Sequence, residues 1–80
     1  MFHEAIGIEF KDGTVLQVAF QDGTVKIYDM AVLFTKYSQL EALKDRELFV
    51  KGRLVGKYGF VWNEDLDIET ETIYQEGVTI

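Results

Sequence analysis

Hydrophobic and polar residues alternate through the first thirty positions, with the period of two that is typical of β-strands. The alternating stretches lie near residues 4–10, 14–20 and 24–28. Between them the pattern Phe-x-Asp-Gly-Thr-Val occurs twice, at 10–15 and again at 20–25. Asp-Gly favours a hairpin turn, and a ten-residue period is too short for a solenoid repeat. This part of the chain therefore predicts an antiparallel three-stranded meander.

The alternation also predicts which side chains share a face of the sheet, because opposed residues in an antiparallel pair point to the same side. The expected pairs include Ile8 with Leu16 in the first hairpin and Phe20 with Val25 in the second. The side chains expected on this common apolar face are Ile6, Ile8, Phe10, Leu16, Val18, Phe20, Val25 and Ile27.

The two turns are expected to differ although both contain Asp-Gly. In the first hairpin a three-residue loop at 11–13 keeps the apolar faces together, with Gly13 in the left-handed position after a type I turn. In the second hairpin a two-residue type I′ turn does so, and this turn requires positive φ at both Asp22 and Gly23.

Beyond residue 28 the pattern changes to short apolar clusters at helical spacing, which predicts several short helices rather than one long helix. Gly52 is expected to end this helical region. The residues expected to begin its turns are Asp29, the capping-box pair Ser38 and Glu41, and Asp45.

The last third of the chain returns to strand-forming residues. Residues 53–62 predict a second hairpin that turns at Gly56 and Gly59, and 63–69 predicts an acidic loop or sheet edge. Residues 70–76 predict a final helical turn. The expected fold over residues 1–80 is a single α+β domain of order β-β-β-α-β-β-α. It has an antiparallel three-stranded meander, a second hairpin, and short helices that cover one face.

Several segments are together similar to one known family. They are Phe20–Asp29 (Phe-Gln-Asp-Gly-Thr-Val-Lys-Ile-Tyr-Asp), Leu43–Phe49, Val61-Trp62, Asp67-Ile68, Ile73-Tyr74 and the N-terminal His3-Glu4. In their order and spacing they resemble the domain-of-unknown-function family 2442 over nearly the whole chain. The chain departs from that family at residues 63–65, where Asn-Glu-Asp stands in place of the usual proline followed by asparagine-glycine.

The resemblance implies a small bacterial protein of α+β fold with no established activity and no assigned catalytic residues. Members of the family are often encoded beside another small protein, in pairs that look like toxin–antitoxin modules. The resemblance therefore favours a protein that acts through a partner.

Composition narrows the chemistry further. The chain has no cysteine and a single histidine, His3, so neither a thiolate site nor a histidine-based metal site or base–nucleophile pair is expected. We therefore predict no catalytic residues, no cofactor and no enzyme. The chain also lacks a basic, apolar leader and an apolar run of the roughly 20 residues that a membrane span needs. A cytoplasmic protein without membrane contact is expected.

The net charge of −6 is unevenly distributed, and residues 59–80 carry six acidic and no basic side chains. Five acids follow the spacing of positions 1, 3, 5, 7 and 12 of a calcium loop, namely Asp65, Asp67, Glu69, Glu71 and Glu76. They form only a weak metal candidate, because Thr70 stands where that loop requires glycine. The favoured alternative is a solvated acidic edge.

Residues 36–58 carry six basic and three acidic side chains, interleaved with the aromatic residues Tyr37, Phe49 and Tyr58. Such a pattern can bind single-stranded nucleic acid, and residues 36–57 are the segment that would do so. The excess of acid over the whole chain disfavours this function. The simpler interpretation is that this segment packs beside the acidic C-terminal segment.

The sequence therefore favours a non-enzymatic protein-interaction module of antitoxin-like character, partnered with a small basic protein encoded beside it. The expected contact residues are Trp62, Glu64, Asp65, Asp67 and Tyr74. An open sheet edge and a small core would also allow a homodimer. The alternative is a small-ligand or metal-binding module that uses the acidic 65–76 segment or a pocket under Trp62.

Overall fold

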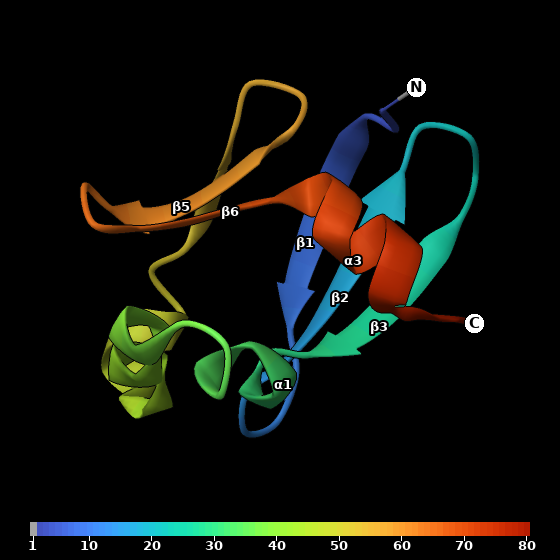
Figure 1. Ribbon diagram of the computed structural model, residues 1–80. Helices are drawn as coiled ribbons and strands as arrows, with labels where there is room; N and C mark the ends of the chain where they lie inside the picture. The colour runs from blue at the N-terminus through green and yellow to red at the C-terminus, as the bar shows by residue number, and fades with distance from the viewer. Residues whose placement is uncertain (1) are drawn as a thin grey trace.

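Two antiparallel sheets make up most of the protein, in a computed structural model that describes residues 2–80 (Figure 1). The four-stranded sheet has the order β1-β2-β3-β7 and contains β1 (Ala5–Phe10), β2 (Val15–Phe20), β3 (Val25–Asp29) and β7 (Val78–Thr79). The three-stranded sheet has the order β4-β5-β6 and contains β4 (Arg53–Val55), β5 (Gly59–Asn63) and β6 (Leu66–Glu69). The meander and the second hairpin are both confirmed, and β6 and β7 are strands that the sequence did not predict.

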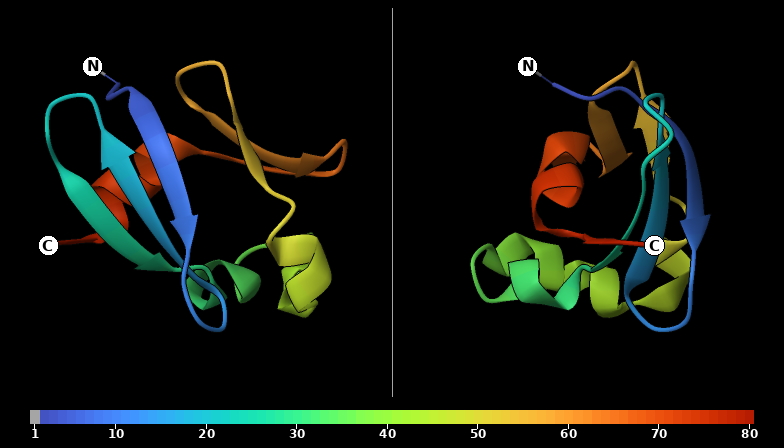
Figure 2. Two further views of the ribbon diagram at one scale, coloured as in Figure 1. Left: turned by 180° about the vertical axis from the view of Figure 1, so that it is seen from behind. Right: turned by 90° about the vertical axis from the view of Figure 1, so that its right-hand side faces the viewer.

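Short helical segments connect the sheets and cover one of them. Between β3 and β4 lie α1 (Ala31–Phe34), the 3-10 helix η1 (Ser38–Lys44) and α2 (Arg46–Phe49). The last helix, α3 (Thr70–Glu76), crosses one face of the four-stranded sheet (Figures 1 and 2). The α+β class is confirmed. Within residues 2–80 no helix is long and apolar enough to cross a membrane.

The first hairpin places its side chains on the predicted face, although its pairing differs from the prediction. Ile8 lies opposite Val18, where Leu16 was expected. This two-residue shift preserves the face because side chains alternate with a period of two. Gly13 has the predicted positive φ, at +66°.

The prediction for Ile6 was wrong. The β1–β2 ladder is irregular between Ala5 and Gly7, so this bulge places Ala5 in the core and leaves Ile6 59% exposed.

The prediction for the second turn was also wrong. Among residues 2–80 only glycines have positive φ, so Asp22 is not left-handed, whereas Gly23 has φ +92°. The Phe20 N–H donates to the Thr24 carbonyl at 2.8 Å, which closes a three-residue loop instead of a two-residue turn.

This longer loop slips β3 by one residue relative to the predicted pairing. Ala19 rather than Phe20 lies opposite Val25, and Leu16 lies opposite Tyr28. A one-residue slip exchanges the two faces of a strand. Tyr28 is therefore buried, while Val25 and Ile27 point away from the core.

The core fills the space between the four-stranded sheet, α3, the connecting helices and the three-stranded sheet. Its fully buried large side chains come from every one of these layers: Leu16, Val18 and Phe20 of β2, Met30, Leu43, Phe49, Phe60 and Ile73. The two sheets and their connecting helices therefore share one core, as expected for a single small domain.

The helix-capping predictions have mixed outcomes. Asp45 caps α2 as predicted, because its carboxylate accepts a hydrogen bond from the Glu47 N–H at 3.1 Å. Asp29 is not the cap of α1, which begins after Met30 without a side-chain cap, although its carboxylate accepts from the Ala31 N–H at 2.9 Å in the turn before the helix. The capping box at Ser38 does not form, because η1 begins after Tyr37 without a side-chain cap.

Gly52 has a different role from the predicted helix stop. α2 already ends at Phe49, and a Cβ at Gly52 would lie 2.6 Å from the Trp62 indole nitrogen. Glycine is required here for close packing.

Candidate functional site

An acidic groove runs between the α1–η1 segment and the β6–α3 segment. Its volume is about 420 Å³. Residues 33–40 form one side and residues 65–76 form the other. The lining residues are Leu33, Lys36, Tyr37, Gln39, Leu40, Asp65, Asp67, Ile68, Glu69, Thr72 and Glu76. The groove therefore joins two segments that lie about thirty residues apart in the sequence.

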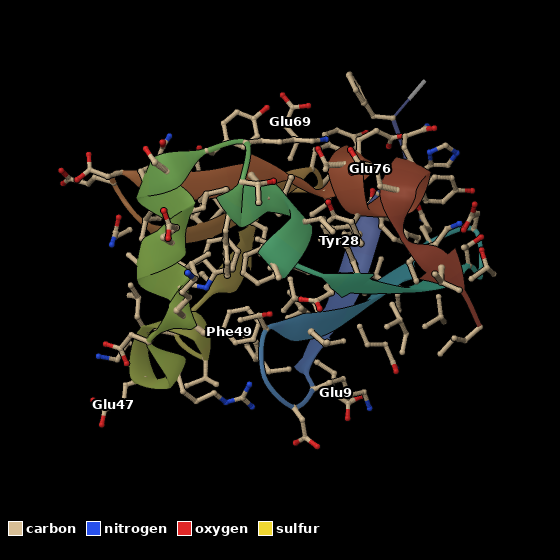
Figure 3. The ribbon with its side chains drawn as sticks, turned by 60° about the horizontal axis from the view of Figure 1, so that its bottom comes forward. Glu9, Tyr28, Glu47, Phe49, Glu69 and Glu76 are labelled. Atoms are coloured by element: carbon tan, nitrogen blue, oxygen red, sulfur yellow. The ribbon has the colours of Figure 1, made fainter. Side chains whose placement is uncertain are left out.

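Strand alternation explains the acidic side of the groove. In β6, Leu66 is buried and Ile68 is half-buried, whereas Asp67 and Glu69 alternate with them and are exposed. Glu76 reaches the same groove from the last turn of α3, on the side of the molecule where Figure 3 also shows Glu69. The four carboxylates of the lining and its single lysine, Lys36, give the groove a net charge of −3.

The carboxylates of the groove have few partners. Within residues 2–80, none of Asp65, Asp67, Glu69 and Glu76 lies within ion-pairing distance of a basic side chain. Glu76 accepts a hydrogen bond from the Tyr28 hydroxyl at 3.0 Å. Burial of Tyr28, reinforced by this carboxylate, raises the pKa of the Tyr28 phenol far above its ordinary value. Tyr28 therefore remains a neutral donor that orients Glu76.

The five acids proposed as a calcium loop do not form one loop. Asp65, Asp67, Glu69 and Glu76 line the groove from a turn, a strand and a helix, whereas Glu71 faces His3. Over the described part of the chain, no group of three or more acidic or histidine side chains is arranged to hold a metal ion. The metal candidate of Asp65, Asp67, Glu69, Glu71 and Glu76 therefore loses its geometric basis, although four of its members share the groove.

Trp62 does not lie on a contact surface. Its side chain is 5% exposed, and the indole N–H donates to the Phe49 carbonyl at 2.8 Å. The ring stacks on Phe60, with ring centroids 4.3 Å apart, and Gly52 lies so close that a Cβ there would collide with both rings. Trp62 is therefore a core residue, which corrects its prediction as a partner contact and the pocket predicted beneath it. Of the other predicted contacts, Glu64, Asp65 and Asp67 are exposed.

Tyr74, the remaining predicted contact, belongs to a polar cluster on α3 outside the groove. The His3 ring stacks on the Tyr74 ring at 3.5 Å, and His3 Nδ1 lies 3.0 Å from the Glu71 carboxylate. The Tyr74 hydroxyl donates to Asp22 at 2.7 Å, which lowers the pKa of Asp22 and raises that of Tyr74. This cluster connects the N-terminal segment and the β2–β3 turn to α3.

Glu71 is held as a carboxylate within this cluster. Burial by itself would raise the pKa of Glu71. Hydrogen bonds from the His3 backbone N–H, the Gln75 amide and the His3 ring outweigh that effect and lower the pKa. The contacts of His3 are thus explained by its role in packing the N-terminal segment against α3.

The aromatic residues interleaved with the basic side chains of residues 36–58 differ in exposure. Phe49 is fully buried, whereas Tyr37 and Tyr58 are 51% and 43% exposed. Arg46 donates to the carbonyls of Lys11 and Gly13, and Lys44 pairs with Glu41. Much of the positive charge in this segment therefore stabilises the fold.

The family model described as "Protein of unknown function (DUF2442)" matches residues 5–79, which include both sheets and every helix of the structure. The chain belongs to this family. The match does not include His3 and Glu4, two of the residues on which the resemblance was stated. No curated protein and no solved structure matches the chain.

In this DUF2442 chain, sequence analysis identified one side of the groove and missed the other. Asp65, Asp67, Glu69 and Glu76 were singled out by their acidity. Lys36, Tyr37 and Gln39 lie on the other side, and the sequence assigned them only to the candidate nucleic-acid segment 36–57. The polar and aromatic character of residues 35–39 was the one signal that this segment lies at the surface. Nothing in its local pattern indicates that it faces β6.

Proposed function

We propose that this DUF2442 protein is a non-enzymatic binding module whose acidic groove holds a basic segment of a partner protein. The observation that carries the proposal is the set of four groove carboxylates without an ion-pair partner among residues 2–80. Clustered like charges repel one another, so an incoming cationic chain relieves this repulsion as well as forming new pairs.

The distribution of the basic side chains supports this function. Three lysines pair with acids outside the groove: Lys11 with Glu9, Lys44 with Glu41 and Lys57 with Glu4. Lys36 lies in the groove, but it forms no ion pair within 4.0 Å over residues 2–80. The negative potential of the groove is therefore only weakly compensated by the protein itself.

The apolar part of the groove determines which basic segment it fits. Leu33, Leu40 and Ile68 contribute apolar surface between the carboxylates. Lysine and arginine can lay their aliphatic stems on such a surface while their charged ends reach the acids. Tyr37, 51% exposed at the rim, adds an aromatic face for a cation. A segment in which basic and apolar residues alternate matches this lining best.

A small basic protein encoded beside this one is the partner that we propose, with this chain acting in an antitoxin-like way. Support comes from the family resemblance and from the charge of the groove. Co-expression of the two neighbouring genes followed by affinity capture would test the partner's identity, which is a separate question from whether the groove binds cations.

A small cationic ligand such as a polyamine is the second candidate. The groove volume of about 420 Å³ falls within the usual range of small-molecule sites, about 300–1,000 Å³. A polyamine has no apolar side chains, so it would leave Leu33, Leu40 and Ile68 uncovered.

The test compares two probes by titration calorimetry, an eight-residue peptide of alternating lysine and leucine, and spermidine. The double variant Asp67→Asn/Glu69→Gln should weaken peptide binding about tenfold, because two charge pairs are lost. The matched control Asp12→Asn/Glu47→Gln changes the net charge equally at exposed acids outside the groove, and it should leave affinity within about twofold. Equal loss in both variants, or no peptide binding at low salt, would contradict the proposal. Binding of spermidine alone would favour the second candidate.

A further inference from the structure

The four-stranded sheet has one covered face and one open face. α3 lies across the covered face, where Leu16, Val18, Phe20 and Tyr28 belong to the core. No helix crosses the other face, which is turned toward the viewer in the left-hand view of Figure 2. In each strand, the residues that alternate with the core residues point to this open face. In β3 these are Val25 and Ile27, because the one-residue slip of that strand turns them away from the core.

The open face is largely apolar along β2, β3 and the C-terminal strand. Its apolar side chains are Val15, Ala19, Val25, Ile27, Val78 and Ile80, and the polar Gln17 lies among them, opposite Glu9 and Ile27. None of these belongs to the core cluster or packs against it, and Val78 and Ile80 are each 68% exposed. A water-facing sheet surface normally carries polar side chains, so a contiguous apolar one indicates an interaction surface.

The charged residues on this face already have partners. Glu9 lies 3.1 Å from Lys11 Nζ, and Asp29 accepts hydrogen bonds from the Thr14 hydroxyl at 2.6 Å and the Ala31 N–H. Both acids lie at the end of the sheet where β1 and β3 finish, away from Ala19 and Val25. Asp29 lies directly opposite Val15 and has no basic partner within residues 2–80. An interface centred on Ala19, Val25 and Ile80 leaves this end of the sheet at the solvent-exposed rim, which avoids the costly burial of an unpaired charge.

We propose that a second copy of this chain covers the open face, so that two four-stranded sheets pack face to face as a two-fold dimer. An apolar surface without free charges cannot select a charged partner, but it is complementary to itself. Valine and isoleucine side chains suit the roughly 10 Å separation of packed sheets. The two copies satisfy the symmetry of an isologous interface.

The size of the face sets the strength of this dimer. Strand spacing and rise give a four-stranded face roughly 20 by 17 Å. Two such faces in contact bury roughly 700–1,000 Å² in all, below the roughly 1,200 Å² of stable interfaces and in the range of weak, transient ones. The dimer should therefore be weak, with a dissociation constant of about 1–100 µM.

The charge distribution permits this arrangement despite the net charge of −6. The groove acids Glu69 and Glu76 lie on the α3 side of the sheet, and Glu9 lies on the other side (Figure 3). Dimerisation through the open face thus keeps the two acidic grooves apart and accessible. The dimer does not depend on the proposed function of the groove, and either can fail while the other holds.

Sedimentation analysis of the full chain from about 10 µM to 1 mM tests the proposal. The mass should rise from 9.2 kDa toward twice that value. Val25→Lys and Ile27→Lys should each raise the dissociation constant about 30-fold or more, as expected for a charge placed in a small interface. Each substitution makes the net charge less negative, so lost association cannot be ascribed to long-range repulsion.

The matched control is Val55→Lys, a valine in β4 that is 48% exposed outside the open face. This variant should dimerise like the unmodified chain. An unmodified chain that stays at 9.2 kDa at 1 mM, or a control that loses association equally, would overturn the proposal.

A second measurement on the unmodified protein does not depend on the variants folding. The methyl NMR signals of Val15, Ala19, Val25 and Ile27 should shift on dilution over the same range, and those of Val55 should not. Concentration-independent signals on the open face, or equal shifts at Val55, would overturn the proposal even if the chain associates.

Discussion

The two Phe-x-Asp-Gly-Thr-Val segments have the same pattern and form different turns. In the first, the Lys11 N–H donates to the Val15 carbonyl at 2.9 Å, so the loop contains residues 12–14. In the second, the Phe20 N–H donates to the Thr24 carbonyl at 2.8 Å, so the loop contains residues 21–23. The glycine is therefore the middle residue of one loop and the last residue of the other. The shared Asp-Gly-Thr-Val residues therefore do not select the turn, and the two segments differ within the repeat only at Lys11 and Gln21.

Different neighbours hold the two turns. Arg46, from α2, donates hydrogen bonds of 2.7 Å to the carbonyls of both Lys11 and Gly13. The second turn instead presents the Asp22 carboxylate to the Tyr74 hydroxyl of α3 and to the Thr24 N–H. The first Asp-Gly turn is thus contacted by the Arg46 guanidinium and the second by the Tyr74 phenol. Each contact stabilises the loop that it touches.

The difference changes what the sheet buries. The second loop sets β3 so that Tyr28 faces the core and Val25 and Ile27 face outward. With the two-residue turn predicted from the sequence, the outward face would have been polar and the core would have lacked Tyr28. A one-residue choice at Asp22-Gly23 therefore creates both the donor to Glu76 and the open apolar face.

The largest expected effect is on stability, when the phenylalanine that begins each repeat is replaced by alanine. Phe20 is 1% exposed and meets the Tyr74 ring edge-on, whereas Phe10 is half-buried. Phe20→Ala should lower the free energy of unfolding by about 3–5 kcal/mol, and Phe10→Ala by about half as much. Urea unfolding followed by circular dichroism measures both, with Phe20→Leu as a milder variant if Phe20→Ala does not fold. Equal losses would show that the two hairpins contribute equally to the core.

An intermediate effect is expected from the cation that holds the first turn. Arg46→Ala removes two hydrogen bonds to carbonyls and a contact of the guanidinium with the Phe49 ring at 5.5 Å. We expect a loss of about 1–2 kcal/mol in the free energy of unfolding. Amide exchange should quicken at Lys11 and not at Phe20.

Arg53→Ala is the control for that variant, because Arg53 is exposed and forms no side-chain hydrogen bond or ion pair within residues 2–80. It should change stability by less than about 0.5 kcal/mol. Faster exchange at both turns in Arg46→Ala would mean that Arg46 stabilises the whole sheet rather than the first turn.

The smallest expected effect is the pH dependence of the second turn. The Tyr74 hydroxyl lowers the pKa of Asp22 below its ordinary value of 3.8, so ionised Asp22 stabilises the fold. This contribution is complete above the ordinary pKa and is lost as the pH falls through the lowered one. Thermal melts between pH 6 and pH 2 should therefore show less acid destabilisation in Asp22→Asn than in the unmodified protein.

Tyr74→Phe should reduce the acid destabilisation in the same direction, because it removes the donor that lowers the pKa of Asp22. Asp12→Asn, the matching position of the first turn, should leave the pH profile unchanged, since the Asp12 side chain forms no ion pair within residues 2–80. An unchanged profile in Asp22→Asn would contradict the role of this contact.

Local sequence predicted the groove unevenly. The acids of β6 were found because charge is visible residue by residue, and the exposed Asp67 and Glu69 follow directly from strand alternation. Their partners across the groove, Lys36 and Tyr37, could not be found, because the path of α1 and η1 depends on packing of Leu33, Leu40 and Leu43. For the same reason Trp62, predicted as a contact, is a core residue that Gly52 allows to pack closely.

The sequence by itself determined strands β1 to β5, the final helix, the positive φ of Gly13, the Asp45 cap and the concentration of acid after residue 63. These features follow from the period of side chains and from interactions between near neighbours, which each segment carries with it. Only the tertiary structure decided the turn at Asp22-Gly23, the face of β3 and the position of the α1–η1 segment across the groove from β6. The first two outcomes depend on small energy differences between alternative turns, and the contact from Tyr74, distant in sequence, is of comparable size. The third depends on how the helical segment packs against the shared core, which no local pattern records.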